Sequence, residues 1–477
     1  MKLCEILEQK NIFITGAAGF VGKVFLFQIL DQFPNIKSIY VLIRPSQKES
    51  AKQRFASLQQ TAPFLYLAKK NSNFQKLWHQ KVHYVEGDIS EKDIFFDSHQ
   101  RQILLEETDV VVNCAALISF NADLKKAYET HIHGAKHLCN FIHQSRKARL
   151  VHMSTAYVAG SRDGFVEECL QGDIAPNGLP FNDEAEQKWI TEQIGLCDQH
   201  LLNDHEGNLK LIGMQRAKQW GWLNTYIYTK ALAEKVIQKN LQKEQFCVVR
   251  PAIIESALRF PMAGWNEGFN TTGIFLYLNQ QGFRFFVAKP ENVVDIVPID
   301  IVTSTLLAVC GAVLTQRHRP VYHIGTSDST ALTIHELKEY CYTWLKKNHK
   351  QLGFVQSLLV HVKPRLVKPA TLFTATGMLL YLEKVLRWSD KIHLKLYRLN
   401  FIKALRKKLS LLSMTESTFQ DFSYNYSYIF SNTNRMDLPY EDFNGHTETV
   451  KDWQAYWFEK HLPGLNQWVF THVPKIF

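Results

Sequence analysis

A tyrosine and a lysine four residues apart are the residues whose types and spacing most directly indicate chemistry. Tyr226 and Lys230 lie in the segment Asn224-Thr-Tyr-Ile-Tyr-Thr-Lys-Ala-Leu-Ala-Glu, and a helix would place them on one face. A nearby ammonium favours a phenolate, so we expect Lys230 to lower the pKa of Tyr226. The pair therefore predicts a general acid that donates a proton near neutral pH.

Spacing alone does not single out this pair. The same interval separates Tyr66 from Lys70, Tyr342 from Lys346 and Tyr456 from Lys460. Only Tyr226 begins an expected helix between the fifth and sixth strands of an expected dinucleotide-binding fold. The other three pairs are predicted to lie on ordinary helix surfaces.

Two hydroxyl side chains come at the end of the fifth expected strand. The strand runs into Val151-His-Met-Ser-Thr-Ala-Tyr157, so Ser154 and Thr155 reach the carboxyl edge of the sheet. We expect Thr155 to hydrogen-bond a substrate carbonyl beside Tyr226, with Ser154 as the second choice. Strand-end hydroxyls also cap backbone groups, and this alternative weighs more for Ser154.

Three glycines follow the first expected strand, in Ile12-Phe-Ile-Thr-Gly-Ala-Ala-Gly-Phe-Val-Gly-Lys23. A strand, a tight glycine turn and a helix N-terminus form a cradle for a pyrophosphate. Gly16 would permit the turn, Gly19 would let backbone approach the phosphate, and Gly22 would allow close helix packing. A nucleoside-triphosphate loop is excluded, because Ala17 and Val24 stand where that motif needs Gly and Ser or Thr.

Arg44, at the end of the second expected strand, indicates which dinucleotide binds. NAD-preferring enzymes usually place Asp or Glu there, whereas a cation suits the 2′-phosphate of NADPH. We therefore predict NADPH; an ordinary surface charge is the alternative. Asp88 is expected to contact adenine or to cap its own loop.

The predicted cofactor-binding residues are Thr15, Gly16, Ala18, Gly19, Phe20, Val21, Gly22, Arg44, Asp88, Ile89, Asn113, Ala115, Lys230, Pro251 and Ile253.

The elements that must position these residues alternate between strands and helices. The expected strands are Asn11–Thr15, Ser38–Arg44, Val82–Asp88, Asp109–Ala116, Arg149–Thr155, Phe246–Pro251 and Val293–Pro298. The expected helices are Val21–Phe33, Asp123–Ser145, Asn224–Asn240 and Ile301–Leu314, and residues 320–325 and 333–347 are expected to close the unit. This rhythm predicts the α/β class, with a Rossmann-type doubly wound parallel sheet.

The character of the chain changes near residue 350, where long basic helical segments begin and two Lys-Pro steps mark a linker. We predict a dinucleotide-binding domain over residues 1–350, with substrate-binding insertions at about 165–222 and 255–292. Residues 351–477 are predicted to form a second, mainly helical domain.

The amino-acid composition limits which classes of protein this chain can belong to. The 477 residues are 46% hydrophobic and 21% charged, which suits a large core and excludes a disordered chain. The eight cysteines are scattered without a Cys-x-x-Cys pair, which favours reduced thiols in a reducing compartment such as the cytoplasm. No metal site is expected: His131, His133 and His137 are predicted to be ordinary helix residues.

Positive charge is concentrated in one segment. Residues 346–408 contain 15 Lys or Arg against Glu383 and Asp390, a balance of +13, so the rest of the chain sums to −3 within the total of +10. This basic segment could attract phosphates or an anionic membrane surface, or be a solvated helix surface. Nucleic acid is not expected, because no matching motif accompanies the charge. The longest uncharged runs are too short for the roughly 18 apolar residues of a membrane span.

Several of these motifs together resemble a known family. The Thr15–Lys23 turn, the Met-Ser-Thr-Ala-Tyr strand end, the helix containing Tyr226 and the segment Val249-Arg-Pro-Ala-Ile-Ile are similar to extended short-chain dehydrogenases/reductases. Residues 250–268 and Asp295-Ile-Val-Pro-Ile-Asp300 resemble, more narrowly, the alcohol-forming fatty acyl-CoA reductases. Phe430–Arg435 and Asp452-Trp-x-x-Tyr-Trp look like the C-terminal helical domain of that family. Ala18 and Val21 depart from its usual Thr and Leu.

The resemblance implies NADPH-dependent reduction of a long-chain fatty acyl-CoA to a fatty alcohol through an aldehyde. Thr155 and Tyr226 would stabilise the oxyanion, and Lys230 would also hold the nicotinamide ribose. Three alternatives stay open: an acyl-CoA reductase that stops at the aldehyde, another extended reductase or a sugar-nucleotide epimerase, and a non-catalytic NADPH-binding regulator. Peripheral membrane contact through residues 346–408, with Lys391, Lys395, Arg398 and Arg406–Lys408 contributing, is a further expectation.

Overall fold

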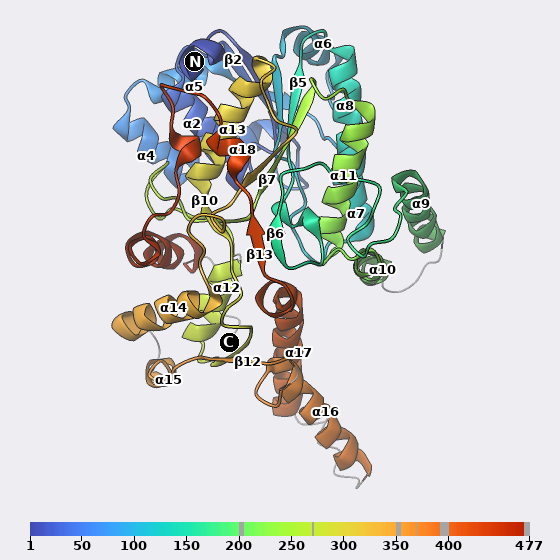
Figure 1. The fold of residues 1–477 in the computed structure, drawn as a ribbon, viewed down its shortest axis with the longest axis vertical. Helices are drawn as coiled ribbons and strands as arrows, with labels where there is room; N and C mark the ends of the chain where they lie inside the picture. The colour runs from blue at the N-terminus through green and yellow to red at the C-terminus, as the bar shows by residue number, and fades with distance from the viewer. Residues whose placement is uncertain (200–204, 270, 350–353, 370, 392–399, 472–477) are drawn as a thin grey trace.

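The computed structural model describes residues 1–199, 205–269, 271–349, 354–369, 371–391 and 400–471 (Figure 1). Its centre is a parallel sheet of seven strands in the order β3-β2-β1-β4-β5-β7-β11. These strands are β1 (Asn11–Thr15), β2 (Ser38–Ile43), β3 (Val82–Glu86), β4 (Val110–Asn113), β5 (Arg149–Met153), β7 (Phe246–Pro251) and β11 (Val321–Ile324). The order reverses direction between β1 and β4, so the predicted doubly wound Rossmann-type sheet is confirmed.

One expected strand lies outside this sheet. Within 293–298 only β10 (Ile296–Pro298) is a strand, and it pairs with β8 (Ile253–Glu255) in a separate two-stranded sheet. The place beside β7 is taken by β11 instead. The expectation that Val293–Pro298 continues the main sheet is therefore wrong, because an apolar strand pattern does not specify its partner.

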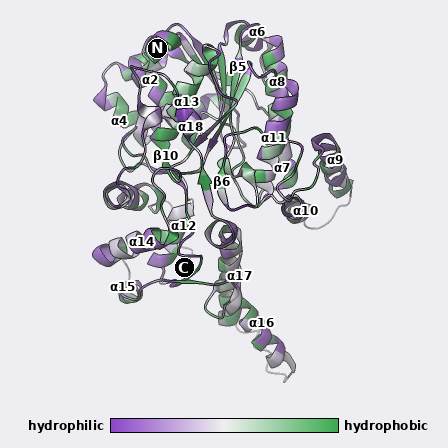
Figure 2. Ribbon diagram, viewed as in Figure 1, coloured by the Kyte–Doolittle hydropathy of each residue, from purple (hydrophilic) through white to green (hydrophobic). Residues whose placement is uncertain are grey.

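Helices cover both faces of the sheet (Figure 1). The first face packs against α2 (Phe20–Gln32) and α13 (Ile299–Leu314), and the second against α8 (Gly134–Gln144) and α11 (Thr225–Asn240). Strand residues alternate between the two cores: Ile12 and Ile14 pack in the first, and Phe13 in the second. Figure 2 shows the hydrophobic colour gathered on the central strands and hydrophilic colour on outer helices such as α9 (Asp183–Gln199).

The remaining elements surround this centre. The other helices and helical turns are α1 (Leu3–Leu7), α3 (Ala51–Ser57), η1 (Leu58–Gln60), α4 (Ala62–Lys70), α5 (Phe74–Lys81), α6 (Ser98–Glu107), α7 (Leu124–Tyr128), η2 (Glu129–His133), η3 (Ala156–Ala159), α10 (His205–Trp220), α12 (Thr271–Gln280), α14 (Ile334–Asn348), α15 (Phe354–Leu359), α16 (Ala375–Lys391), α17 (Asn400–Gln420), η6 (Asp421–Asn425), α18 (Thr433–Met436), η7 (Gly445–Thr447), α19 (Trp453–Ala455), η8 (Tyr456–His461), α20 (Leu462–Gly464) and η9 (Leu465–Val469). The short strands are β6 (Gly164–Val166), β9 (Phe285–Val287), β12 (Arg365–Val367) and β13 (Tyr428–Phe430).

The C-terminal region is mainly helical and returns to the sheet domain. α16 and α17 project together away from the sheet in Figure 1, and β13 then pairs with β6. Arg435 is fully buried and donates to the backbone carbonyls of Gly325 and Glu448. The division into two domains at residue 350 stays a prediction. Within the described residues, no helix has the length and apolarity needed to cross a membrane.

A buried ion pair fixes α11 against the sheet. Arg250 of β7 donates to both carboxylate oxygens of Glu234, at 3.0 and 2.6 Å, and a third hydrogen bond of 2.9 Å reaches the carbonyl of Cys169. The side chains are 4% and 1% exposed. Such a pair is costly to break from one side, because the remaining charge stays buried without a partner.

We predict that Arg250→Met destabilises the fold by about 3–5 kcal/mol. The double variant Arg250→Met/Glu234→Leu should recover most of this loss, because it leaves no uncompensated charge. Urea unfolding followed by tryptophan fluorescence measures both. Arg259→Met is the matched control, since Arg259 is 72% exposed in its ion pair. Equal losses in the single and double variants would contradict the prediction.

Candidate active site

Helix α11 presents Tyr226 and Lys230 near the carboxyl ends of the strands. The side chain of Asn224 caps the helix by accepting from the backbone N–H of Ile227 at 2.9 Å, so Tyr226 lies in its first turn. The Tyr226 ring centroid is 5.8 Å from that of His131 and 6.3 Å from that of Phe120. Within the described residues its hydroxyl has no hydrogen-bond partner, which leaves it available to a ligand.

Burial controls the protonation of both residues. It raises the pKa of Tyr226 above its usual value and lowers the pKa of Lys230 to about 8. The expectation that Lys230 lowers the pKa of Tyr226 is therefore wrong, because the cost of desolvating the phenolate dominates. Tyr226 is a neutral phenol at neutral pH, which is the form that can donate a proton.

A chain of buried polar side chains connects the first strand to Lys230. Thr15 Oγ1 donates to Asn113 Oδ1 at 2.6 Å, and Asn113 Nδ2 lies 3.0 Å from His152 Nδ1. Lys230 Nζ lies 3.5 Å from His152 Nε2 and donates to the carbonyl of Met153 at 2.5 Å. Burial lowers the pKa of His152 well below its usual value, so the ring is neutral. The chain holds Lys230 in place, and among the residues that the structure describes no carboxylate is within ion-pair distance of its Nζ.

Sheet register brings this chain together. Thr15 pairs with Asn113, and Asn113 with His152, in the parallel ladder. Each lies two residues after a member of the second core, so the alternation of strand side chains turns all three toward α11. Lys230 on α11 completes the chain from the same side.

The two predicted hydroxyls have different surroundings. Thr155 Oγ1 accepts from the backbone N–H of Tyr157 at 3.4 Å and so caps the η3 turn. Its own proton remains available to a substrate oxygen. Ser154 Oγ is buried and has no hydrogen-bond partner within the described residues. The backbone-capping alternative thus describes Thr155 rather than Ser154, and both hydroxyls lie at the end of β5.

The glycine turn has the shape of a pyrophosphate cradle. Gly16 has a φ of +71°, and a Cβ on it would lie 2.6 Å from the backbone of Cys114. A Cβ on Gly22 would lie 2.3 Å from the carbonyl oxygen of Gly16. Gly19 caps the N-terminus of α2 and meets only the Gly16 carbonyl oxygen, at 3.3 Å. The outer side of the turn thus lies open at the N-terminus of α2, where the first N–H groups of a helix favour an anion, which fits a dinucleotide phosphate.

Arg44 and Asp88 contact each other at 3.2 Å. The Arg44 side chain is 63% exposed, so it can reach a phosphate in solvent. Asp88 also accepts from the backbone N–H and the hydroxyl of Ser90, as expected if it caps its loop. Its contact with adenine stays a prediction.

The other predicted cofactor residues lie around the same edge. The backbone N–H of Ala115 donates to Thr15 Oγ1 at 3.3 Å, and Ile89 packs against Gly134. Pro251 ends β7 and Ile253 begins β8. Their cofactor contacts stay predictions, as do those of Ala18, Phe20 and Val21 at the start of α2.

Sequence reasoning missed three residues near Tyr226. His152 belongs to the polar chain from Thr15 to Lys230. Its position could have been noticed in the sequence, because it is a polar residue inside an otherwise apolar strand. His131, predicted to be an ordinary helix residue, accepts from the backbone N–H of Leu117 at 3.0 Å and lies 2.8 Å from the Thr229 hydroxyl. The π-helical turn η2 that carries it has no clear signal in the sequence. Phe120 gave no sequence signal.

Comparison with known proteins shows which family the chain belongs to. The model of the NAD-binding family described as male sterility protein matches residues 14–306. The alcohol-forming fatty acyl-CoA reductase of Simmondsia chinensis is 30% identical over 357 residues, covering 72% of each chain. The chain belongs to the fatty acyl-CoA reductase family. Fatty acyl-CoA reductase 8 of Arabidopsis thaliana is 27% identical over 99% of each chain.

Two solved structures have a similar fold. The terminal reductase domain of the myxalamid pathway has a TM-score of 0.56 at 14% identity, covering 96% of this chain and 90% of that one. The reductase domain of a nonribosomal peptide synthetase from Mycobacterium tuberculosis also gives 0.56 at 14% identity, over 97% and 95%. The matched N-terminal region is an NAD(P)-binding domain.

We predict that kcat/KM falls as pH rises through about 8, because Lys230 with a pKa of about 8 loses its charge there. The ammonium is present below that pH and supports negative charge on the neighbouring phenol or substrate oxygen. A pH–rate profile from 6 to 10 measures this. Lys230→Met should be slow throughout and lack the alkaline fall. The same fall in Lys230→Met would contradict the assignment.

Proposed function

We propose that this member of the family reduces a long-chain fatty acyl-CoA to the fatty alcohol, with NADPH as reductant and the aldehyde as intermediate. The observation that carries the proposal is the Tyr226 hydroxyl on α11, which has no hydrogen-bond partner within the described residues and lies one turn before the buried Lys230. The relative from Simmondsia chinensis is named as alcohol-forming, which supports the full reduction.

The residues have complementary roles in this reaction. Two NADPH molecules, bound one after the other, would supply the two hydrides, one for the thioester and one for the aldehyde. Negative charge develops on the thioester oxygen, where Tyr226 and Thr155 donate hydrogen bonds that stabilise it. Breaking of the carbon–sulfur bond releases CoA thiolate and leaves the aldehyde. In the second reduction Tyr226 donates its proton to the alkoxide oxygen, and the charge of Lys230 stabilises the phenolate that remains.

The choice of NADPH rests on Arg44. It follows β2 as an exposed cation, where NAD-preferring enzymes usually carry a carboxylate. A 2′-phosphate would compete with Asp88 for its guanidinium. Equal kcat/KM with NADPH and NADH in the assay below would contradict this part of the proposal.

The function is tested by incubating the purified chain with NADPH and acyl-CoAs of different lengths. We expect two NADPH oxidised per alcohol formed, followed by absorbance at 340 nm and by gas chromatography of extracted products. Formation of the aldehyde with one NADPH oxidised would agree with the proposed active site but contradict the second reduction. Absence of turnover with every acyl-CoA would contradict the proposed substrate class.

Tyr226→Phe tests the proton donor. Loss of the phenol should lower kcat/KM by at least about 100-fold with an unchanged unfolding midpoint. Tyr66→Phe is the matched control, because Tyr66 has the same spacing to a lysine and is 43% exposed. Turnover in Tyr226→Phe similar to that of the control would contradict the role.

We also propose that the basic segment 346–408 contacts an anionic membrane surface. On α16 and the turn before it, five large apolar side chains are more than half exposed to solvent: Leu372, Phe373, Leu380, Tyr381 and Trp388. Arg406 and Lys407 on α17 are exposed cations. Lys395 and Arg398, expected to contribute, lie outside the described residues, and the side chains of Lys391 and Lys408 are not described.

Vesicle sedimentation tests this contact. The chain should bind phosphatidylcholine vesicles containing phosphatidylserine and dissociate as salt is raised. Trp388→Asp should weaken binding, whereas Leu179→Asp, at a side chain 55% exposed in the 165–222 insertion, should not. Absent or salt-insensitive binding would contradict the proposal.

A further inference from the structure

A narrow apolar cavity lies between the sheet domain and α17. Its walls come from α12, β9, α14, α17 and η6, and it has a volume of about 130 Å³. Aromatic and aliphatic side chains predominate in the lining: Ile253, Ile274, Phe275, Leu278, Phe283, Phe285, Phe286, Val287, Ala288, Val294, Ile334, Leu337, Leu412, Phe419 and Phe422. The cavity therefore suits a hydrocarbon.

Three polar residues in the lining are already engaged, and one of them, Glu416, accepts from the backbone N–H of Ala375 at 2.8 Å. Thr272 Oγ1 donates to Glu255 at 2.5 Å and lies 2.9 Å from His461 Nε2. Ser423 Oγ donates to the carbonyl of Val287 at 2.8 Å. These contacts leave few polar partners for a ligand, so a chain containing amides would lose hydrogen bonds to water without replacing them.

Aromatic contacts connect the inner end of the cavity to the candidate active site. The ring of Phe422, which lines the cavity, stacks on Phe120 at 5.6 Å and meets Tyr157 edge-on at 5.0 Å. Phe120 in turn lies 6.3 Å from Tyr226, and Tyr157 follows Thr155 by two residues. The cavity thus lies directly behind the aromatic wall of the site that carries the proton donor.

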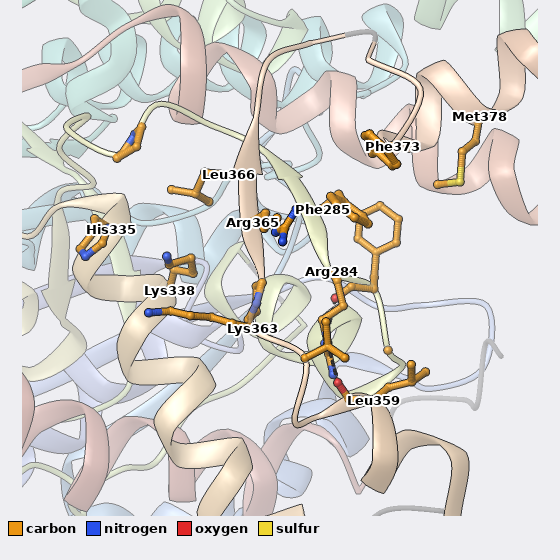
Figure 3. A pocket seen from close by; sticks show the side chains of 15 residues that line it. Arg284, Phe285, His335, Lys338, Leu359, Lys363, Arg365, Leu366, Phe373 and Met378 are labelled. Carbon is orange, nitrogen blue, oxygen red and sulfur yellow. Dashed lines mark hydrogen bonds between the residues drawn. The ribbon is translucent and has the colours of Figure 1, made fainter.

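The other end adjoins a wider pocket of about 1050 Å³. Phe283 and Phe285 line both spaces. Figure 3 shows Phe285, Phe373 and Met378 on one side of the wide pocket and the basic side chains of Lys338 and Lys363 on the other. The Phe285 and Phe373 rings stack at 5.0 Å. An extended ligand could pass from the narrow cavity into this pocket.

We propose that the narrow cavity binds the acyl chain of the substrate and that longer chains extend from it into the wide pocket. This assignment rests on the proposed function for the identity of the ligand. An apolar cavity of roughly 150 Å³ holds about one benzene, so the narrow cavity accommodates only part of a long chain. The pantetheine arm of CoA, with its two amides, approaches Tyr226 from outside the cavity.

Two substitutions on opposite walls test the assignment. Leu278→Trp on α12 and Leu412→Trp on α17 each fill the cavity, and both side chains are half-buried. Each should lower kcat/KM for hexadecanoyl-CoA by about tenfold or more and lower that for a short acyl-CoA such as butanoyl-CoA by less, because a shorter chain loses fewer apolar contacts. The matched control is Leu211→Trp on α10, at a side chain 56% exposed. If one variant fails to fold, the other still tests the assignment.

Binding of the fluorescent fatty acid cis-parinaric acid separates this assignment from the proposed function. The wild-type chain and Leu211→Trp should bind it, and the two cavity-filling variants should bind it at least about tenfold more weakly. Probe binding with this pattern but no turnover of any acyl-CoA would support the cavity while contradicting the function. Turnover with unchanged chain-length profiles and unchanged probe binding in both variants would overturn the cavity and leave the function standing.

Discussion

The buried ion pair between Glu234 and Arg250 sets the position of α11 over the sheet. Tyr226, Lys230 and Glu234 follow one another at intervals of four residues, so one face of the helix carries all three. Once Arg250 of β7 holds Glu234, Lys230 one turn earlier must meet the end of β5. A slide of one turn would leave two charges without partners in a dry interior, which makes alternative positions costly.

Much of the fold was predictable from sequence because its determinants are local. β1 has the expected bounds, and α2 and α11 begin within one residue of them, since uninterrupted apolar runs and the turn at Gly16 and Gly19 act over a few residues. The family resemblance was confirmed for the same reason: its motifs are contiguous. Val293–Pro298 shows the limit, because choosing a strand partner is a property of the whole sheet.

The residues of the candidate site could be proposed from the sequence, but the hydrogen bonds between them could not. Tyr226, Lys230 and Thr155 could be selected from type and position along the chain. The contacts of His152 with Asn113 and Lys230 require the register of β4 with β5 and the placement of α11, which no single segment contains. The raised pKa of Tyr226 likewise depends on burial by residues far away in sequence, so spacing to Lys230 suggested the opposite direction.

The walls of the narrow cavity and the polar chain beneath Tyr226 come from different elements. α12 and α17 contribute no residue to the chain that runs from Thr15 to Lys230, whereas β1, β4 and β5 contribute no residue to the cavity lining. Mutations that reshape the lining therefore need not disturb the groups that move protons. Descendants of such a chain can therefore change the shape of the cavity while the residues from Thr15 to Lys230 stay as they are.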